Sequence, residues 1–193
     1  MNGEPLAAPF PEKRDVSLSI ARVNLLAVPF ALGPLVVIPG LFLILWGWPR
    51  IAQTAPVLFR WEVLLPALLA GIVGHELLHA ATWMLSGTVP RSAIRFGIQW
   101  KTITPYAHCS VPMPARAYRI GAAVPGIVLG ILPAAYGLAA GNAAWMLYGT
   151  FFAIAAAGDA IILWLLRGTS AAALVEDHPT RAGCTVIDPP VGF

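Results

Sequence analysis

Four long apolar stretches limit the folds that this sequence can adopt. They span residues 23–48, 61–87, 118–140 and 143–166. Each is long enough to cross a hydrocarbon core of about 30 Å, which takes roughly 20 helical residues. The chain is 58% hydrophobic and 11% charged, whereas a soluble domain of average composition is about 25% charged. The sequence therefore predicts an all-α integral membrane protein with about four transmembrane helices.

The segments outside these stretches are short, so we expect a single membrane-embedded domain over residues 1–193. Its predicted parts are a tail at 1–22, a four-span core at 23–166 and a second tail at 167–193. The first tail lacks the apolar core of a signal peptide, so the first apolar stretch should remain in the mature chain.

Basic residues are distributed unevenly around the predicted spans. The first loop holds only Arg50 and Arg60, and the turn at 141–142 holds none. The other basic residues lie in the two tails and in or next to residues 88–117. The positive-inside rule then predicts that both termini and the 88–117 segment are cytoplasmic.

Charge and cysteine content exclude two further classes of protein. The formal net charge of +3 is too small and too scattered to indicate nucleic-acid binding. The two cysteines, Cys109 and Cys184, have neither the spacing of a zinc ribbon nor the density of a disulfide scaffold. We expect two unpaired thiols, which a cytoplasmic location would keep reduced.

The first apolar stretch contains three prolines, at positions 29, 34 and 39. We expect a kinked span, in which neighbouring helices satisfy the backbone groups that the prolines free. A re-entrant hairpin is the alternative, and it would invert the orientation of everything that follows. The distribution of basic residues favours the crossing span.

The second apolar stretch contains the sequence His75-Glu76-Leu77-Leu78-His79. Residues four apart lie on one face of a helix, so His75 and His79 can bind the same ion. A His-Glu-x-x-His pattern on a helix is typical of zinc sites in which the glutamate is the general base. The alternative is that both histidines only pack or form hydrogen bonds. Burying ionisable groups in a span costs about 2.5–3.5 kcal/mol each, which a bound Zn²⁺ would offset, so the metal site is favoured.

A catalytic zinc ion usually has three protein ligands and one open position. Asp159 is the only ionisable residue inside the fourth apolar stretch. In the predicted topology, His79 and Asp159 both lie roughly 12 Å from the cytoplasmic ends of their spans. This matched depth predicts Asp159 as the third ligand, with a helix–helix hydrogen bond as its alternative role. The competing ligands, all outside the spans, are His108, Asp177 and His178.

Residues 94–101 alternate strictly between apolar and other side chains, which is the pattern of a half-buried strand. We expect Pro105 to end this strand and residues 107–111 to return as a second one. The result would be a short β-hairpin-like insert between the second and third spans. It could rest on the membrane or protein surface, or its edge could hold an extended substrate by strand addition. These two roles stay open at this point.

Two other segments carry weaker signals. Pro125-Gly126 and Pro133 should bend the third stretch, either to open a water path or as an ordinary packing kink. The second tail is polar enough to be solvated, and Pro189 and Pro190 limit any final strand.

These features together resemble two groups of proteins. The His75–His79 motif on a second span, the strand-like insert and an aspartate in the fourth span resemble the site-2 protease family of intramembrane zinc metalloproteases. A closer likeness is to the bacterial membrane proteins known as putative zincin peptidases. It rests on the Tyr106-Ala107-His108 region, on Gly158-Asp159 and on Asp177-His178-Pro179. The resemblance covers most of residues 61–188.

The resemblance implies Zn²⁺ as the cofactor and a location in a bacterial inner or plasma membrane. It also implies roles for four residues, with His75 and His79 as metal ligands, Glu76 as the base and Asp159 as the third ligand.

The leading hypothesis is a membrane-embedded zinc metallopeptidase that hydrolyses peptide bonds near or within the membrane. Its partners would be the lipid bilayer and a membrane-protein or peptide substrate, with no nucleic acid. The alternative is a non-catalytic membrane protein whose structural metal site binds partner proteins. A fourth ligand from His108 or His178 would favour that alternative. Metal transport is less favoured, because one site on four short helices offers no relay of ligands across the membrane.

Overall fold

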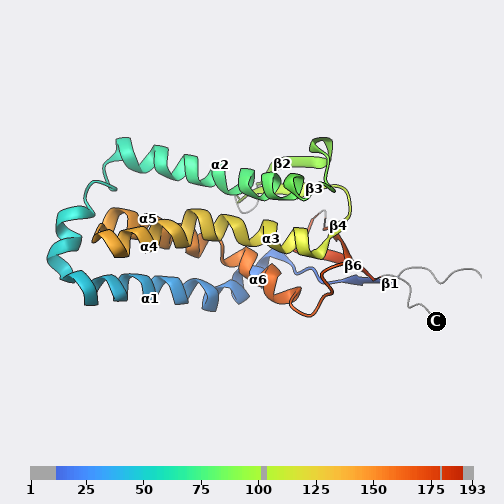
Figure 1. Cartoon of the computed structure of the whole chain (residues 1–193), viewed down its shortest axis with the longest axis horizontal. Helices are drawn as coiled ribbons and strands as arrows, with labels where there is room; N and C mark the ends of the chain where they lie inside the picture. The colour runs from blue at the N-terminus through green and yellow to red at the C-terminus, as the bar shows by residue number, and fades with distance from the viewer. Residues whose placement is uncertain (1–11, 101–103, 179, 189–193) are drawn as a thin grey trace, which may run out of the picture.

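A bundle of long helices with a small β-sheet at one end makes up the computed structural model, which describes residues 12–100, 104–178 and 180–188 (Figure 1). The helices are α1 (Ile20–Thr54), α2 (Trp61–Leu85), α3 (Ala115–Pro125), α4 (Leu132–Ala140), α5 (Ala143–Ala155) and α6 (Ala157–Leu165). The strands are β1 (Glu12–Asp15), β2 (Ile94–Gln99), β3 (Thr104–Cys109), β4 (Met113–Pro114), β5 (Leu174–Asp177) and β6 (Cys184–Asp188). A 3₁₀ turn, η1 (Arg91–Ala93), precedes β2, and a π-helical segment, η2 (Gly126–Ile131), joins α3 to α4.

Among the described residues, three helices are long and apolar enough to cross a membrane. They are Ala21–Thr54, Trp61–Leu85 and Ala115–Ala140, and the last of these runs through α3, η2 and α4. The α5–α6 pair is a further candidate, bent by 44° at the break between its two helices. The mostly helical architecture is therefore confirmed, and the four predicted apolar stretches correspond to three long helices and one bent pair.

The first helix breaks at Gly47 and not at its first three prolines, where the sequence predicts the kink. Gly47 has φ 71° and ψ 171°, a conformation that glycine adopts without steric cost. The residues on either side of the break hold the α4–α5 turn. Trp46 donates from Nε1 to the carbonyl of Leu138 at 2.8 Å, and Arg50 donates from Nε to the carbonyl of Gly141 at 2.7 Å.

The predicted bend in the third stretch takes the form of the π-helical segment, which starts directly after Pro125. A proline lacks the N–H that would continue the regular helical hydrogen bonds, so the ladder must change there. The helix then packs against α5 through glycines. A side chain at Gly137 would clash with the backbone of Met146, and one at Gly149 with the backbone of Ala134. Such close backbone approach is typical of helices that pack within a membrane.

The fourth stretch is two helices, because the backbone of Ala156 has left the helical region (φ −77°, ψ 6°). Helix α6 starts at the next residue, which places Asp159 in its first turn. Small residues allow tight packing at this break, where a side chain at Gly126 would meet Ala156 at 3.0 Å. The break therefore sets the direction in which the Asp159 side chain points from the first turn of α6.

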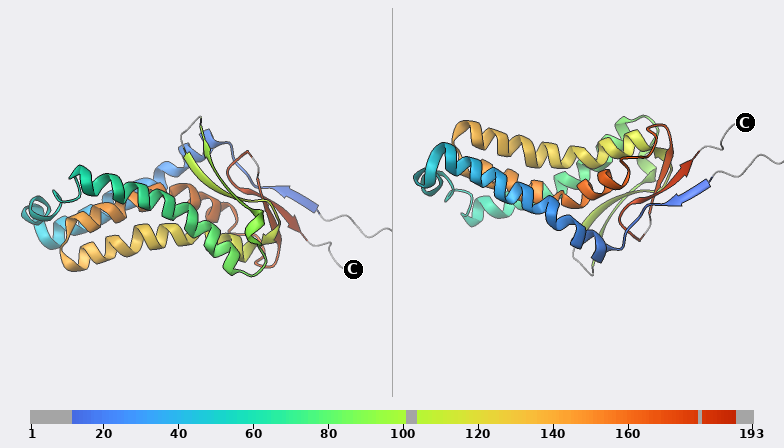
Figure 2. Two further views of the ribbon diagram at one scale, coloured as in Figure 1. Left: turned by 90° about the horizontal axis from the view of Figure 1, so that it is seen from above. Right: turned by 90° about the horizontal axis from the view of Figure 1, so that it is seen from below.

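The two ends of the chain meet in an antiparallel sheet of order β1-β6-β5-β4, which closes one end of the bundle (Figure 2). Its inner face joins the ends of α3 and α6 in one core, with Val175 and Val186 packed alongside Tyr118 and Leu166. The sequence predicted solvated tails here and missed this sheet. Residues 1–11 of the first tail, and Pro189 and Pro190, lie outside the described residues. Both cysteines are free, as predicted, and both are buried.

The predicted hairpin is confirmed as the antiparallel pair β2–β3, with Phe96 opposite Ala107 and Ile98 opposite Pro105. The prediction that Pro105 would end the first strand was wrong, because Pro105 lies inside β3. Within the described ranges, β3 pairs only with β2 and has no strand on its other edge, where the missing N–H of a proline breaks no ladder bond. The side chains of His108 and Tyr106 share the face of the hairpin opposite to that of Ala107.

Candidate metal centre

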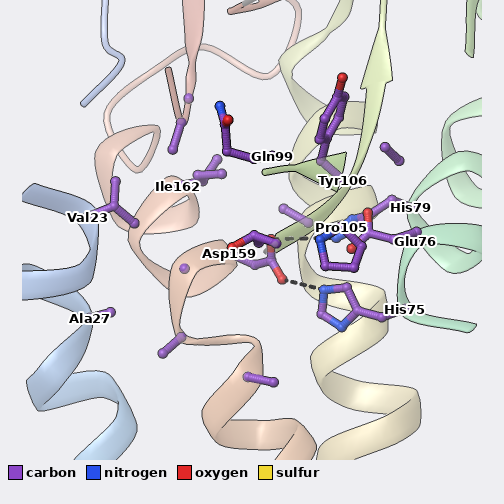
Figure 3. A pocket seen from close by; sticks show the side chains of 18 of the residues that line it. Val23, Ala27, His75, Glu76, His79, Gln99, Pro105, Tyr106, Asp159 and Ile162 are labelled. Carbon is purple, nitrogen blue, oxygen red and sulfur yellow. Dashed lines mark hydrogen bonds and ion pairs between the residues drawn. The ribbon is translucent and has the colours of Figure 1, made fainter. Parts of the chain in front are cut away.

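His75, His79 and Asp159 converge on one point, where α2 meets the first turn of α6 (Figure 3). Nε2 of His75 lies 3.1 Å from Oδ2 of Asp159, and Nε2 of His79 lies 3.5 Å from Oδ1. One ligand atom from each residue lies within 4.8 Å of the others. The structure therefore brings together the three residues that helical spacing and matched depth predict as ligands.

His79 is held in one orientation by α3, since its Nδ1 lies 2.9 Å from the carbonyl oxygen of Gly121. A carbonyl only accepts, so Nδ1 carries the proton and Nε2 keeps its lone pair on the side of Asp159. The ring also stacks on Trp83, with centroids 5.6 Å apart. Any side chain at Gly121 would overlap the Trp83 indole. Metal-binding histidines usually have such an outer hydrogen bond, which fixes the tautomer.

The donor set fits a zinc ion. Two imidazole nitrogens and one carboxylate are ligand types that zinc prefers, and three protein ligands leave the open position of a catalytic site. The side chains of His75, His79 and Asp159 are only 13%, 9% and 17% exposed. Burial removes three polar groups from water, and a shared divalent cation would compensate for the hydration that they lose.

Glu76 lies beside the three converging residues, at the edge of the hairpin (Figure 3). Its carboxylate takes a hydrogen bond from the backbone N–H of Ala107 in β3. The next outward-facing N–H of this strand, from Cys109, donates to Oδ2 of Asp177 at 3.3 Å, and Pro105 has none. The free edge of β3 thus holds one carboxylate on each side of His108.

A cavity of about 760 Å³ opens beside these residues. Its lining residues come from the beginning of α1, the C-terminal half of α2, α3, the end of α5, α6 and the hairpin. The turn between β5 and β6 also borders it. Its walls are mainly apolar, and a few convergent polar groups lie at one end, which is the usual composition of a small-molecule or peptide site.

The competing ligands of the sequence analysis border the same cavity but are engaged elsewhere. Nδ1 of His108 lies 2.9 Å from Oδ2 of Asp177. Nδ1 of His178 accepts from the backbone N–H groups of Thr180 and Arg181 at 3.1 Å and 3.0 Å. Within the described part of the chain, the group of His, Cys, Asp or Glu residues close enough to share an ion is His75, His79 and Asp159. A closed four-ligand site thus finds no support from these two histidines.

Three contributors to the site were missed by sequence reasoning. They are Gly121 through its carbonyl, Ala107 through its N–H, and Tyr118, whose hydroxyl donates to Oδ1 of Asp177 at 2.8 Å. Backbone donors and acceptors have no side-chain signature, so only the fold reveals the first two. Tyr118 offered a signal, because a tyrosine buried at the end of a span requires a partner for its hydroxyl.

Comparison with known proteins supports the zinc chemistry. A family model described as "Putative zincin peptidase" matches residues 68–174, more than half of the chain. The matched region contains the His-Glu-x-x-His motif, the hairpin and Asp159. Searches among curated proteins and among solved structures gave no match.

Proposed function

The chain belongs to the zincin-type family whose model it matches, and from this premise we propose that it is a membrane-embedded zinc metallopeptidase. The observation that supports this function most directly is the convergence of His75, His79 and Asp159 at a cavity that also holds Glu76. His75, His79 and Asp159 would hold the zinc ion. Glu76 would act as the general base.

When bound, zinc supplies Lewis acidity that activates water and polarises a carbonyl group. The chain itself supplies the proton transfers. A carboxylate oxygen of Glu76 takes one proton from the attacking water as the new C–O bond forms at the peptide carbonyl. The same carboxyl group returns this proton to the amide nitrogen as the C–N bond breaks. The products are one new carboxyl group and one new amine.

The hydrogen bond from Ala107 orients Glu76 for this work. It occupies part of the carboxylate's acceptor capacity and ties the position of the carboxylate to the hairpin. Orientation of a general base within hydrogen-bond reach of its proton is the first requirement for this kind of catalysis. The hairpin could also hold an extended substrate, as the alternation of its residues predicts. Strand addition on the β3 edge would then require Ala107 to release Glu76.

The membrane location rests on the length and surface of the helices. Three or four of them can span a bilayer, and large apolar side chains lie exposed along α1, among them Leu25, Val36 and Ile44. A soluble monomer rarely exposes so long an apolar surface. Together with the zinc motif inside a span, this favours peptide-bond hydrolysis near or within the membrane, as in the site-2 proteases that the chain resembles.

The test uses the full chain purified in detergent, with Glu76→Gln as the variant. We expect about one zinc per chain in both proteins, and a loss of cleavage of roughly 10²–10⁴-fold in the variant. Zinc is measured by mass spectrometry, and cleavage is measured on labelled casein and on a single-span model peptide. Glu62→Gln is the matched control, because Glu62 lies on the same helix in an exposed ion pair with Arg60. Zinc-free wild-type protein, or a Glu76→Gln variant that cleaves like wild type, would refute the proposed mechanism.

A further inference from the structure

A second His–Asp pair borders the same cavity as the candidate metal centre. His108 and Asp177 both border the cavity, and Nδ1 of the histidine lies 2.9 Å from Oδ2 of the aspartate. Strand β3 places His108 one residue after Ala107, whose N–H bonds Glu76. The Cα atoms of these neighbours are therefore about 3.8 Å apart.

Several hydrogen bonds hold the Asp177 carboxylate in place beside His108. Its carboxylate accepts from three groups on two different elements: the His108 ring, the backbone N–H of Cys109 at 3.3 Å and the Tyr118 hydroxyl at 2.8 Å. The aspartate side chain is 13% exposed and the histidine side chain 23%. Three donors from two elements therefore fix the orientation of this carboxylate.

The hydrogen bond to Asp177 occupies Nδ1 of His108 and leaves Nε2 as the ring nitrogen that could contact a substrate. Because a carboxylate accepts, Nδ1 carries a proton, and Nε2 has no partner among the described residues. The hydrogen bond to Asp177 raises the pKa of His108 above its ordinary value, and partial burial opposes this. A larger fraction of the rings therefore carries a second proton, on Nε2, where it can be donated.

We propose that His108, positioned by Asp177, is a catalytic residue that donates a hydrogen bond from Nε2 to the peptide carbonyl oxygen as that oxygen becomes negatively charged. The inference rests on the proposed peptidase function and assigns a residue to it. Glu76 and His108 would then act on the same peptide bond, the first on the proton of the water and the second on the carbonyl oxygen. A donor aimed at developing charge stabilises the transition state more than the ground state.

The test separates charge recognition from ordinary peptide binding. The zinc-loaded full chain is titrated with a phosphinic peptide, whose tetrahedral phosphorus and anionic oxygens mimic the tetrahedral carbon and its negatively charged oxygen. It is also titrated with a neutral peptide of the same side chains. In His108→Gln we expect the phosphinic peptide to bind about 100-fold more weakly and kcat to fall about 10²–10³-fold. The neutral peptide should bind within about 3-fold of wild type, and zinc content should not change.

His178→Asn is the matched control. His178 borders the same cavity, but its Nδ1 closes the β5–β6 turn by accepting two backbone N–H groups. An asparagine side-chain oxygen can accept in the same way, so both affinities should stay near wild type. Asp177→Asn is a second variant that keeps the histidine but removes its anionic partner, and it should weaken the phosphinic peptide selectively as well.

The outcomes distinguish this inference from the proposed function. If wild-type protein binds zinc but does not bind the phosphinic peptide, the proposed function and the inference both fail. If His108→Gln and Asp177→Asn bind the phosphinic peptide like wild type, the inference alone fails. Equal weakening of the phosphinic and neutral peptides also overturns it, because it would show a structural role for His108.

Discussion

Two His–Asp pairs, His75–Asp159 and His108–Asp177, line one cavity, and their surroundings give them different chemistry. Asp159 faces two imidazoles, with Nε2 of His75 at 3.1 Å and Nε2 of His79 at 3.5 Å. Asp177 faces one imidazole, and its other acceptor sites are taken by a tyrosine hydroxyl and a backbone N–H. The first pair directs imidazole nitrogens and carboxylate oxygens toward a common point, which suits a cation. The second is saturated by hydrogen-bond donors, which suits the positioning of a ring.

Replacing the aspartate of each pair by asparagine tests this difference in chemistry, and it should give the largest effect. Asp159→Asn should lower zinc affinity by more than the roughly 10–100-fold that loss of an outer hydrogen-bond partner costs, because a ligand charge is removed. Asp177→Asn should leave zinc affinity almost unchanged. Competition with a chromogenic chelator on the purified full chain measures both. Similar losses in the two variants would mean that the two pairs act as one site.

The first pair and its helices could largely be predicted from the sequence, because the signals were local. Apolar length predicted the helices, and the i,i+4 spacing placed His75 and His79 together. Asp159 lies 84 residues from His75, yet it was found because a span restricts the depth of every residue in it. The break at Ala156, which sets the direction of Asp159, has no equally clear signal among neighbouring alanines.

The second pair could not be predicted, because it depends on the sheet formed by the chain ends. His108 and Asp177 were noted only as competing ligands, and nothing in the sequence pairs them. Strand β5 has four residues, too few for alternation to be distinguished from chance, and one of its two partners, β4, lies about 60 residues earlier in the chain. Pairings of such long range arise from tertiary packing and leave little local pattern.

The next effect concerns Gly121, the residue through which α3 orients His79. In Gly121→Ala the added methyl group would overlap the Trp83 indole. Either the indole or the carbonyl that holds His79 must then shift. We expect zinc affinity to fall roughly 10–100-fold and the free energy of unfolding to fall by about 1–3 kcal/mol. Trp83 also stacks on Tyr118, which donates to Asp177, so the selectivity for the phosphinic peptide at saturating zinc reports whether a displaced indole reaches the second pair.

Gly74→Ala is the matched control for this change, because a methyl group there meets only Leu129 at 3.9 Å, an ordinary contact. It lies next to His75, so it reports on any general sensitivity of the motif helix to added volume. We expect wild-type zinc affinity from it. Equal zinc affinities in the two variants would remove Gly121 from the set of residues that support the metal centre.

The smallest effect is the pH dependence of the second pair, and its sign follows from the raised pKa of His108. A raised pKa means that the folded protein binds this proton more tightly than the unfolded chain. The stabilising contribution is therefore fully present below the unfolded value of about 6.5, and it is lost as pH rises through the higher folded value. The difference in thermal midpoint between wild type and His108→Gln, measured in detergent from about pH 5 to about pH 9, should shrink toward alkaline pH. A difference that grows with pH would show that Asp177 holds a neutral ring, and the hydrogen-bond donor assigned to Nε2 would then be absent.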